Sequence, residues 1–316
     1  MKRMRWSLAW AGPCLLALLL VGGSLPRSWA GPPSPTGREP ITPLPEAPPA
    51  DPARVALGAR LFHDPRLSGD GRSACSTCHD MRSNGASRQA RDLSPDGREL
   101  PVNTLTVFNA ALNFRLNWEG GIRDLEEHAE SSLRNPAIMN ANLAIVLRRL
   151  SADPELVEAF RRAYGRPPDR QALLGALATY QASLLTPGSR FDRWLSGDRT
   201  ALTEEEWSGY QLFRSAGCIA CHQGANVGGN LFQRRGIFHP LASPEPRVLR
   251  VPSLRNVGAT APYFHDGSAE TLEEAVRGMG LAQLNRAFAP AEVDAIAAFL
   301  RTLTGTWQGL EVTAPP

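Results

Sequence analysis

The sequence predicts an all-α protein of two domains with long irregular loops. Several stretches place apolar residues at three- and four-residue intervals between capping residues, which is the pattern of amphipathic helices. No stretch shows strand-type alternation of useful length. The chain has 316 residues, enough for two cores of ordinary size. One five-residue pattern occurs twice, as "CSTCH" at 75–79 and as "CIACH" at 218–222.

Residues 1–30 have the three parts of a cleavable signal peptide. Basic residues near the start precede the apolar run "LLALLLVGG" at 15–23, and "SWA" at 28–30 supplies a small-residue cleavage site. An uncleaved membrane anchor is the alternative, but the apolar run is shorter than the ~18–20 residues that span a bilayer. We therefore expect an exported, periplasmic protein.

Removal of this segment changes the charge of the chain. Four of the 34 basic residues and none of the 31 acidic residues lie in it, so 30 basic and 31 acidic groups remain. A balanced chain of this kind predicts no strongly basic face. Nucleic acid is therefore not expected as a partner.

The next segment, 31–50, is rich in proline and cannot sustain a helix or a central strand. It predicts a polyproline-like tether or an extended arm. Order is expected to begin at Asp51 and Pro52, which suit the N-cap and the first position of a helix. The expected buried stripe of that helix is Leu57, Leu61 and Phe62. The polar, glycine-dotted stretch 83–101 predicts a long loop.

Three helices are expected from the apolar spacing at 140–150, 153–165 and 169–185. Asp153 with Pro154 marks the start of the second of these, and Gly165 marks its end. Glycine and proline at 186–198 predict a connector. We therefore place the first domain at 51–192 and the second at 193–316.

The second domain contains two capping boxes, Thr203 with Glu206 and Thr271 with Glu274, each at the start of an expected helix. A last helix is expected at 291–303. Its expected buried residues are Val293, Ile296, Leu300 and Leu303.

The repeated Cys-x-x-Cys-His pattern is the signature of covalent attachment of a c-type haem. Two thiols three residues apart can meet the two vinyl groups of one porphyrin, and the next histidine can ligate the iron. A four-cysteine zinc site or a redox dithiol is the alternative, but neither needs histidine fixed after each pair. The sequence predicts two haems, one held by Cys75, Cys78 and His79, the other by Cys218, Cys221 and His222.

From about residue 53 to 305 the chain resembles the bacterial di-haem cytochrome c peroxidases and the related MauG-type enzymes. The resemblance is carried by "LGARLFHDPRLSGDGRSACSTCH", "NTLTVFNAALNFRLNWEGGIRDLEEHA", "FDRWLSGDRTALTEEEWSGYQLFRSAGCIACHQGANVGGNLFQ" and "VPSLRNVGATAPYFHDGSAETLEEAVRGMG", in family order. It implies two cytochrome c-like domains. The N-terminal haem would react with peroxide, and the C-terminal haem would take electrons from a small donor protein.

The resemblance also implies roles for single residues. Met279 stands where the peroxidases place the second axial ligand of the electron-transfer haem, and a gap-filling core methionine is the alternative. Trp118 matches a tryptophan that lies between the haems. Asn103, Thr260 and Pro262 match the positions that hold a calcium ion through oxygen atoms, so one Ca²⁺ is expected. His265 also matches, with an expected structural role.

The sequence departs from the family pattern near the first haem. The peroxidases carry a histidine ligand in the loop after it, whereas 83–101 contains no histidine, methionine, cysteine or tyrosine, and the matching position is near Pro95. We expect this haem to keep an open sixth site. Where the family has a glutamine and an acid–base glutamate, this chain has His128 and Ile138. His128 is the expected acid–base group, with Glu127 as the fallback; a surface histidine facing water is the alternative.

The leading expectation is a periplasmic di-haem peroxidase that reduces hydrogen peroxide to water. Its electrons would come from a cytochrome c or a small copper protein of the cupredoxin type. A MauG-like enzyme that oxidises residues of a partner protein is the first alternative, and a di-haem electron carrier is the second. A homodimer is compatible with the sequence. His63 and His239 match no ligand of the family and are expected to be ordinary histidines.

Overall fold

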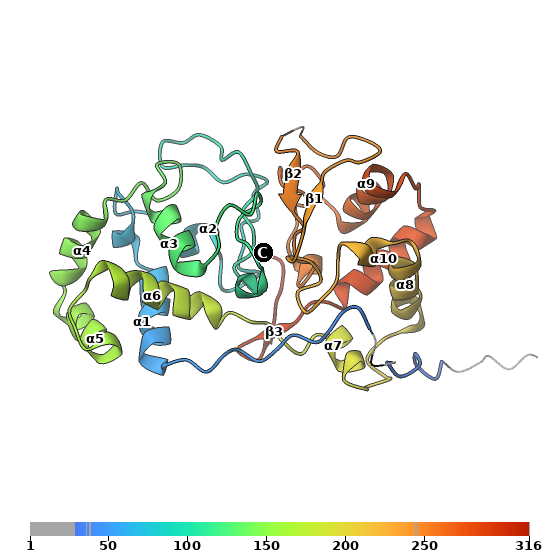
Figure 1. Cartoon of the computed structure of the whole chain (residues 1–316), viewed down its shortest axis with the longest axis horizontal. Coiled ribbons are helices and arrows are strands. Elements are labelled where there is room, and N and C mark those ends of the chain that lie inside the picture. The colour runs from blue at the N-terminus through green and yellow to red at the C-terminus, as the bar shows by residue number, and fades with distance from the viewer. Residues whose placement is uncertain (1–28, 36, 38, 244, 316) are drawn as a thin grey trace, which may run out of the picture.

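The computed structural model describes residues 29–35, 37, 39–243 and 245–315. These residues form two helical bodies, the N-terminal one blue to green and the C-terminal one yellow to red in Figure 1. Most of the predicted signal peptide, residues 1–28, lies outside the described residues. No helix in the described part of the chain is long and apolar enough to cross a membrane.

The first body is built from α-helices and short 3-10 turns. In chain order they are α1 (Pro52–Phe62), η1 (Pro65–Leu67), α2 (Cys75–Cys78), η2 (Ala110–Leu112), α3 (Leu125–Arg134), α4 (Leu143–Ser151), α5 (Pro154–Tyr164) and α6 (Arg170–Ala182). The side chain of Asp51 caps α1 by accepting from the Ala53 N–H. Asp153 caps the start of α5, and Gly165 ends that helix in the left-handed conformation. The predicted helix signals are thus confirmed.

Helices α1 and α6 cross closely at the centre of the first body. A Cβ at Gly58 of α1 would overlap the carbonyl oxygen of Ala176 in α6, so glycine is what lets the two backbones approach. Leu57, Leu61 and Phe62 are buried as predicted. They belong to the first core, the cluster that also includes Leu133, Leu150, Phe160 and Leu177.

The second body repeats this arrangement with fewer helices. Its elements are α7 (Arg190–Leu195), α8 (Glu204–Ser215), η3 (Cys218–Ala220), η4 (Val257–Ala259), α9 (Leu272–Leu284) and α10 (Pro290–Arg301). Both predicted capping boxes form, at the starts of α8 and α9. Gly209 of α8 has no room for a Cβ because the Ala295 carbonyl of α10 lies against it. The second core is the cluster that includes Phe191, Trp194, Tyr210, Val293 and Phe299.

Strands contribute little. β1 (Phe232–Arg234) pairs antiparallel with β2 (Val248–Arg250), with Phe232 opposite Arg250. β3 (Thr306–Trp307) pairs with β4 (Leu310–Glu311) in a second short hairpin. In the described part of the chain these two hairpins are the only sheets, which confirms the all-α prediction.

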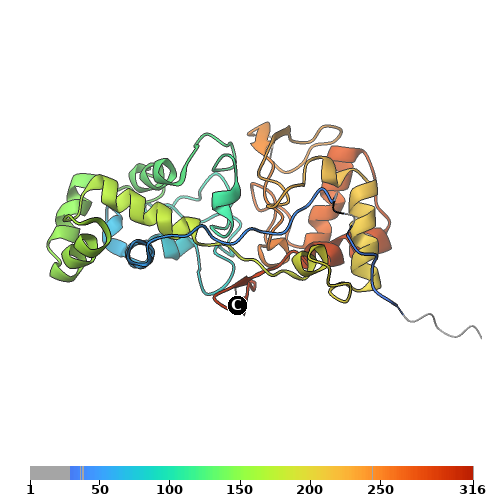
Figure 2. The same ribbon diagram turned by 60° about the horizontal axis from the view of Figure 1, so that its bottom comes forward.

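Two segments near the ends of the described chain cross to the opposite body (Figure 2). The N-terminal arm packs on the second body, and the C-terminal segment packs on the first. The proline-rich segment is an extended arm along the second body, and its Ile41 is 1% exposed within the second core. At the other end, Val312 is buried in the first core, and Trp307 packs against it beside Phe108 at 5.4 Å between ring centroids. The two bodies are therefore tied together by both termini.

The predicted connector at 186–198 contains a helix. α7 spans the expected boundary at 192/193, and its Phe191 and Trp194 are fully buried in the second core. Apolar side chains at 191 and 194 lie three residues apart on one helix face, which is why this glycine-marked stretch folds onto the second body.

Candidate functional site

The first Cys-x-x-Cys-His motif forms the single turn α2 and ends at its histidine. The Thr77 hydroxyl accepts a hydrogen bond from the Ala74 N–H at 3.0 Å and caps the turn. Nδ1 of His79 lies 3.1 Å from the carbonyl oxygen of Gly85. Because a carbonyl oxygen only accepts, Nδ1 carries the proton and Nε2 keeps the lone pair that a haem iron requires.

The second motif has the same design in the 3-10 turn η3. Gly217 precedes it at φ 94°, a left-handed conformation that glycine adopts without strain. Nδ1 of His222 lies 3.4 Å from the carbonyl oxygen of Val227, and the residue is 9% exposed. Its Nε2 is therefore also left as the ligating atom.

Burial sets the protonation of both motifs. It lowers the pKa of His79 and that of His222, the latter to about 4, so both imidazoles are neutral. Burial raises the pKa of the Cys75 and Cys78 thiols to about 12 and that of Cys218 to about 11. Unpaired thiols beside a neutral imidazole fit covalent attachment and ligation of a haem.

The two motifs lie in different bodies. Cys75 packs against the first core and Cys218 against the second. In the described residues no three His, Cys, Asp or Glu side chains gather as a metal site. The four cysteines therefore do not form the zinc site considered as an alternative, which would need them around one ion.

Met279 lies on α9, in the second body, and is partly buried. It is not among the apolar residues that form the second core or pack against it. The second haem motif lies in the same body.

His128 lies on α3, in the same body as His79. Nε2 of His128 is 2.8 Å from Oδ1 of Asn117, so Nε2 donates and Nδ1 is the free base. Burial lowers the pKa of His128 to about 4. The residue is half-buried.

Glu127, Ile138 and Pro95 are all exposed. Glu127 is exposed, and its Oε2 accepts from the backbone N–H of Arg123 at 3.1 Å, which makes it part of the α3 N-terminus. Ile138 is 41% exposed. Pro95 is also exposed, in a loop that Ser94 and Asp96 organise by local hydrogen bonds. None of these three residues is brought to His79 by a contact that the structure records in the described residues.

Trp118 lies at the junction of the two bodies. Its Nε1 donates to the Asn103 carbonyl at 2.8 Å, and its own carbonyl accepts from the Arg250 N–H at 2.8 Å. The ring of His265 from the second body packs edge-on at 6.3 Å. With 8% exposure, the indole is fixed between elements that belong to different haem motifs.

Asn103 is held at the same junction. Its backbone N–H donates to the His265 carbonyl at 2.7 Å, and its side-chain nitrogen donates to the carbonyls of Gln89 and Ala90. These bonds leave the amide oxygen as the atom that a cation would use. Thr260 and Pro262 follow η4 in the second body, a few residues before His265. Amide and carbonyl oxygens of this kind fit Ca²⁺.

Two arginines are buried, and the sequence carries no signal for this because arginine is ordinarily exposed. Arg250 is 2% exposed and donates to the Asn117 carbonyl at 3.1 Å and to Asn113 Oδ1 at 3.2 Å. Burial lowers its pKa to about 10. Because Asn117 also bonds His128, Arg250 connects the second body to the candidate acid–base group.

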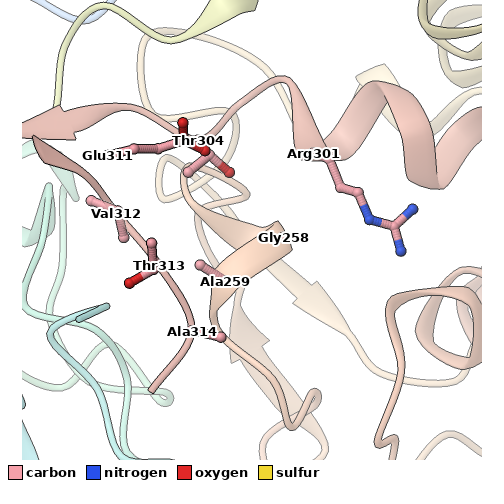
Figure 3. A pocket seen from close by; sticks show the side chains of 8 residues that line it. All are labelled: Gly258, Ala259, Arg301, Thr304, Glu311, Val312, Thr313 and Ala314. Atoms are coloured by element: carbon pink, nitrogen blue, oxygen red, sulfur yellow. The ribbon is translucent and has the colours of Figure 1, made fainter. Parts of the chain in front are cut away.

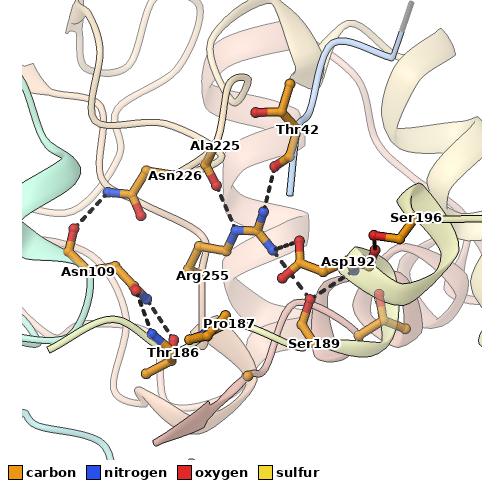
Figure 4. A network of polar contacts seen from close by, with 12 residues as sticks. Thr42, Asn109, Thr186, Pro187, Ser189, Asp192, Ser196, Ala225, Asn226 and Arg255 are labelled. Atoms are coloured by element: carbon orange, nitrogen blue, oxygen red, sulfur yellow. Dashed lines mark hydrogen bonds and ion pairs between the residues drawn. The ribbon is translucent and has the colours of Figure 1, made fainter. Parts of the chain in front are cut away.

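Arg255 forms the second buried cluster, on the side of the second haem motif (Figure 4). Its guanidinium pairs with Asp192 at 2.8 Å and donates to the carbonyls of Ala225 and Thr42 at 2.8 and 2.9 Å. Ala225 lies in the loop that follows His222, and Thr42 lies in the N-terminal arm. One side chain therefore joins the arm, α7 and the haem-binding loop.

One pocket of the described residues lies apart from both haem motifs. This open pocket of about 280 Å³ lies beneath the C-terminal segment, between Gly258, Arg301 and Val312 (Figure 3). It contains none of the predicted ligands, and its position reflects the crossing of the C-terminal segment toward the first body.

Two separate haem-attachment motifs, each on a helical body with its own core, define a di-haem c-type cytochrome. A family model described as di-haem cytochrome c peroxidase matches residues 52–200, and one described as cytochrome c matches residues 208–304. The chain belongs to the di-haem cytochrome c peroxidase family, whose members are peroxidase oxidoreductases with two c-type haems.

Individual relatives agree with this assignment. The chain is 39% identical to a cytochrome c551 peroxidase of Nitrosomonas europaea, with 84% of each chain covered. It is 35% identical to the methylamine utilization protein MauG of Methylorubrum extorquens, over 73% of this chain and 69% of that protein. A solved structure of a MauG-like protein associated with microbial copper homeostasis superposes with a TM-score of 0.74 and 26% identity, covering 88% of this chain and 95% of that one.

Proposed function

We propose that this protein is a periplasmic peroxidase in which the first haem is permanently open to hydrogen peroxide and His128 is the acid–base group. His79 would hold the haem that supplies the reduction of peroxide, and His222 and Met279 would hold the haem that takes electrons from a cytochrome c or cupredoxin. Asn103, Thr260 and Pro262 would hold one Ca²⁺ between the two domains. The observation that carries the proposal is the placement of His128.

His128 has the chemistry that peroxide cleavage requires. With Nε2 bonded to Asn117 Oδ1, the free Nδ1 of the neutral ring can take a proton from one oxygen of hydrogen peroxide. It can then deliver that proton to the other oxygen, which leaves as water. The bond to Asn117 fixes the ring, and Arg250 fixes Asn117 through its carbonyl.

Trp118 and the residues around it would connect the two domains during turnover. Its indole is packed against His265 and bonded to Asn103, so it is rigid and dry. A rigid aromatic ring at this point shortens the path between the two haem domains. The 83–101 loop contains no histidine, methionine, cysteine or tyrosine, so activation by loss of such a ligand would be unnecessary.

A MauG-like activity on a partner protein is the second candidate. It is supported by the same open site and by Ile138 at the position of the family glutamate. The two candidates differ in what consumes the oxidising equivalents. Steady oxidation of reduced cytochrome c or cupredoxin under peroxide supports the peroxidase, whereas modification of a partner without donor turnover supports the MauG-like enzyme.

The central test is the reaction of the fully oxidised holoprotein with hydrogen peroxide, followed by stopped-flow absorption. An immediate spectral change without pre-reduction is expected. His128→Gln should slow it strongly. His239→Gln is the matched control, because His239 makes the same 2.8 Å bond to an asparagine, Asn285, but on the surface of the second body. Equal rates in the two variants would contradict the role of His128.

A further inference from the structure

A continuous chain of aromatic rings leads from the second haem motif to the protein surface. The ring of Phe213 lies 6.3 Å from that of His222 and 5.2 Å from that of Phe299. Phe299 lies 5.1 Å from Tyr210. Tyr210 and Phe213 are also three residues apart on α8, so they share one helix face.

The chain continues through two tryptophans. Trp194 lies 5.6 Å from Tyr210 and 5.2 Å from Trp207, and Trp207 lies 5.7 Å from Tyr210. Trp194 is fully buried, whereas Trp207 is partly exposed. Tyrosine and tryptophan are the side chains that most readily lose one electron, and here all three are in contact between a haem ligand and solvent.

Tyr210 has a base in place to receive its proton. Its hydroxyl donates to Oε2 of Glu39 at 2.5 Å, and Tyr210 itself is 0% exposed. Arg214 lies 3.2 Å from the same carboxylate oxygen. Burial, and then the bond to Glu39, raise the pKa of Tyr210, so the phenol is protonated at rest. A buried phenol loses an electron easily only when its proton can leave at the same time.

We propose that Tyr210 is a redox-active residue that gives an electron to the oxidised second-haem centre while its phenolic proton passes to Glu39, with Trp194 and Trp207 extending the path to the surface. The O–H bond of Tyr210 breaks, an O–H bond forms at Glu39 Oε2, and a neutral tyrosyl radical remains. Hydrogen peroxide is the oxidant, so the inference rests on the proposed peroxide reaction. The path would discharge oxidising equivalents when no donor protein is bound.

Tyr180 in the first body is the matched comparison. It is 5% exposed, and Phe62 connects it to His79 with centroid distances of 5.4 and 6.3 Å. Burial raises its pKa as well. Among the described residues, however, no carboxylate accepts from its hydroxyl. The two tyrosines therefore differ chiefly in the presence of Glu39.

The test is rapid-freeze electron paramagnetic resonance of the holoenzyme mixed with hydrogen peroxide in the absence of a donor protein. A radical signal that narrows on ring-deuteration of tyrosine is expected. Tyr210→Phe should abolish it, and so should Glu39→Gln, which retains a hydrogen-bond acceptor but cannot take up the proton at neutral pH. Tyr180→Phe should leave it unchanged. A signal that survives both Tyr210→Phe and Glu39→Gln, or that is lost in Tyr180→Phe, overturns the proposal.

A second arm separates this inference from the peroxide reaction. Hexachloroiridate, a one-electron oxidant, is applied to the same holoproteins, and peroxide consumption is measured independently. If peroxide is not consumed, the proposed function fails, while the radical on Tyr210 is still expected with hexachloroiridate. After oxidation, peptide mass spectrometry should find oxygen added to Trp207 in the wild-type chain. The same modification should be absent from Tyr210→Phe. Equal oxidation of Trp207 in both would contradict the path.

Discussion

The buried ion pair of Arg255 and Asp192 gives the sharpest stability prediction. Both side chains are nearly inaccessible, with 0% and 6% exposure, and their charged atoms are 2.8 Å apart. In Asp192→Asn the guanidinium keeps its bonds to Ala225, Thr42 and Ser189 but loses its counter-charge. Removing one partner of a buried pair costs about 3–5 kcal/mol. Because three acceptors remain, we expect a loss at the lower end, about 3 kcal/mol.

Scanning calorimetry of the oxidised holoprotein measures this loss. The chain has two bodies, so the transition of the second body is followed rather than one overall midpoint. For a domain of this size, each kcal/mol of lost stability lowers the melting temperature by about 2–4 °C. A loss of about 3 kcal/mol should therefore lower the melting temperature of the second body by roughly 10 °C. The transition of the first body should move less, because Arg255 contacts only the arm and the second body.

The control is Asp96→Asn. Asp96 forms an ion pair of similar length with Arg98, at 2.6 Å, but the two side chains are 56% and 81% exposed. Solvent screens such pairs, so no measurable change in the melting temperature is expected. If Asp192→Asn and Asp96→Asn shift the second transition equally, burial does not make the Arg255 pair important, and its assigned role is wrong.

Three further predictions concern the site. Trp118→Phe removes the hydrogen-bond donor to the Asn103 carbonyl and should cost about 1–3 kcal/mol of stability. In stopped-flow traces the variant should show slower electron transfer between the haems and an unchanged reaction with peroxide. Removal of Ca²⁺ by a chelator should lower the melting temperature. Adding Ca²⁺ back to a free concentration one hundred times the Kd should restore about 2.7 kcal/mol of folding stability. Recovery with Mg²⁺ alone would count against a calcium site. The pKa of His128 is lowered to about 4, so its ring is a free base at neutral pH. The rate of reaction with peroxide should therefore be constant near neutral pH and fall as the pH drops through about 4. A fall near the ordinary histidine pKa of ~6.5 would contradict the assignment.

Local signals predicted the helical elements well because each depends on a few neighbouring residues. Asp51 with Pro52, Asp153 with Gly165, and the capping boxes at Thr203 and Thr271 all act within one turn of helix. The haem motifs are local in the same way, because two thiols and an imidazole must meet one porphyrin. The same locality explains why the connector at 186–198 was not recognised as helical: its stability comes from Phe191 and Trp194 packing on a distant core.

By itself, the sequence determined the fold class, the two haem attachments and the family, since these depend on short motifs and on their order. Only the tertiary structure decided where the proline-rich arm lies, which arginines are buried, and that Glu39 meets Tyr210 from 171 positions away. It also placed His128, half-buried, in contact with Asn117 while leaving Glu127 exposed at the start of α3. The physical reason is that desolvation and long-range contacts depend on the whole packed chain, and no local pattern records them.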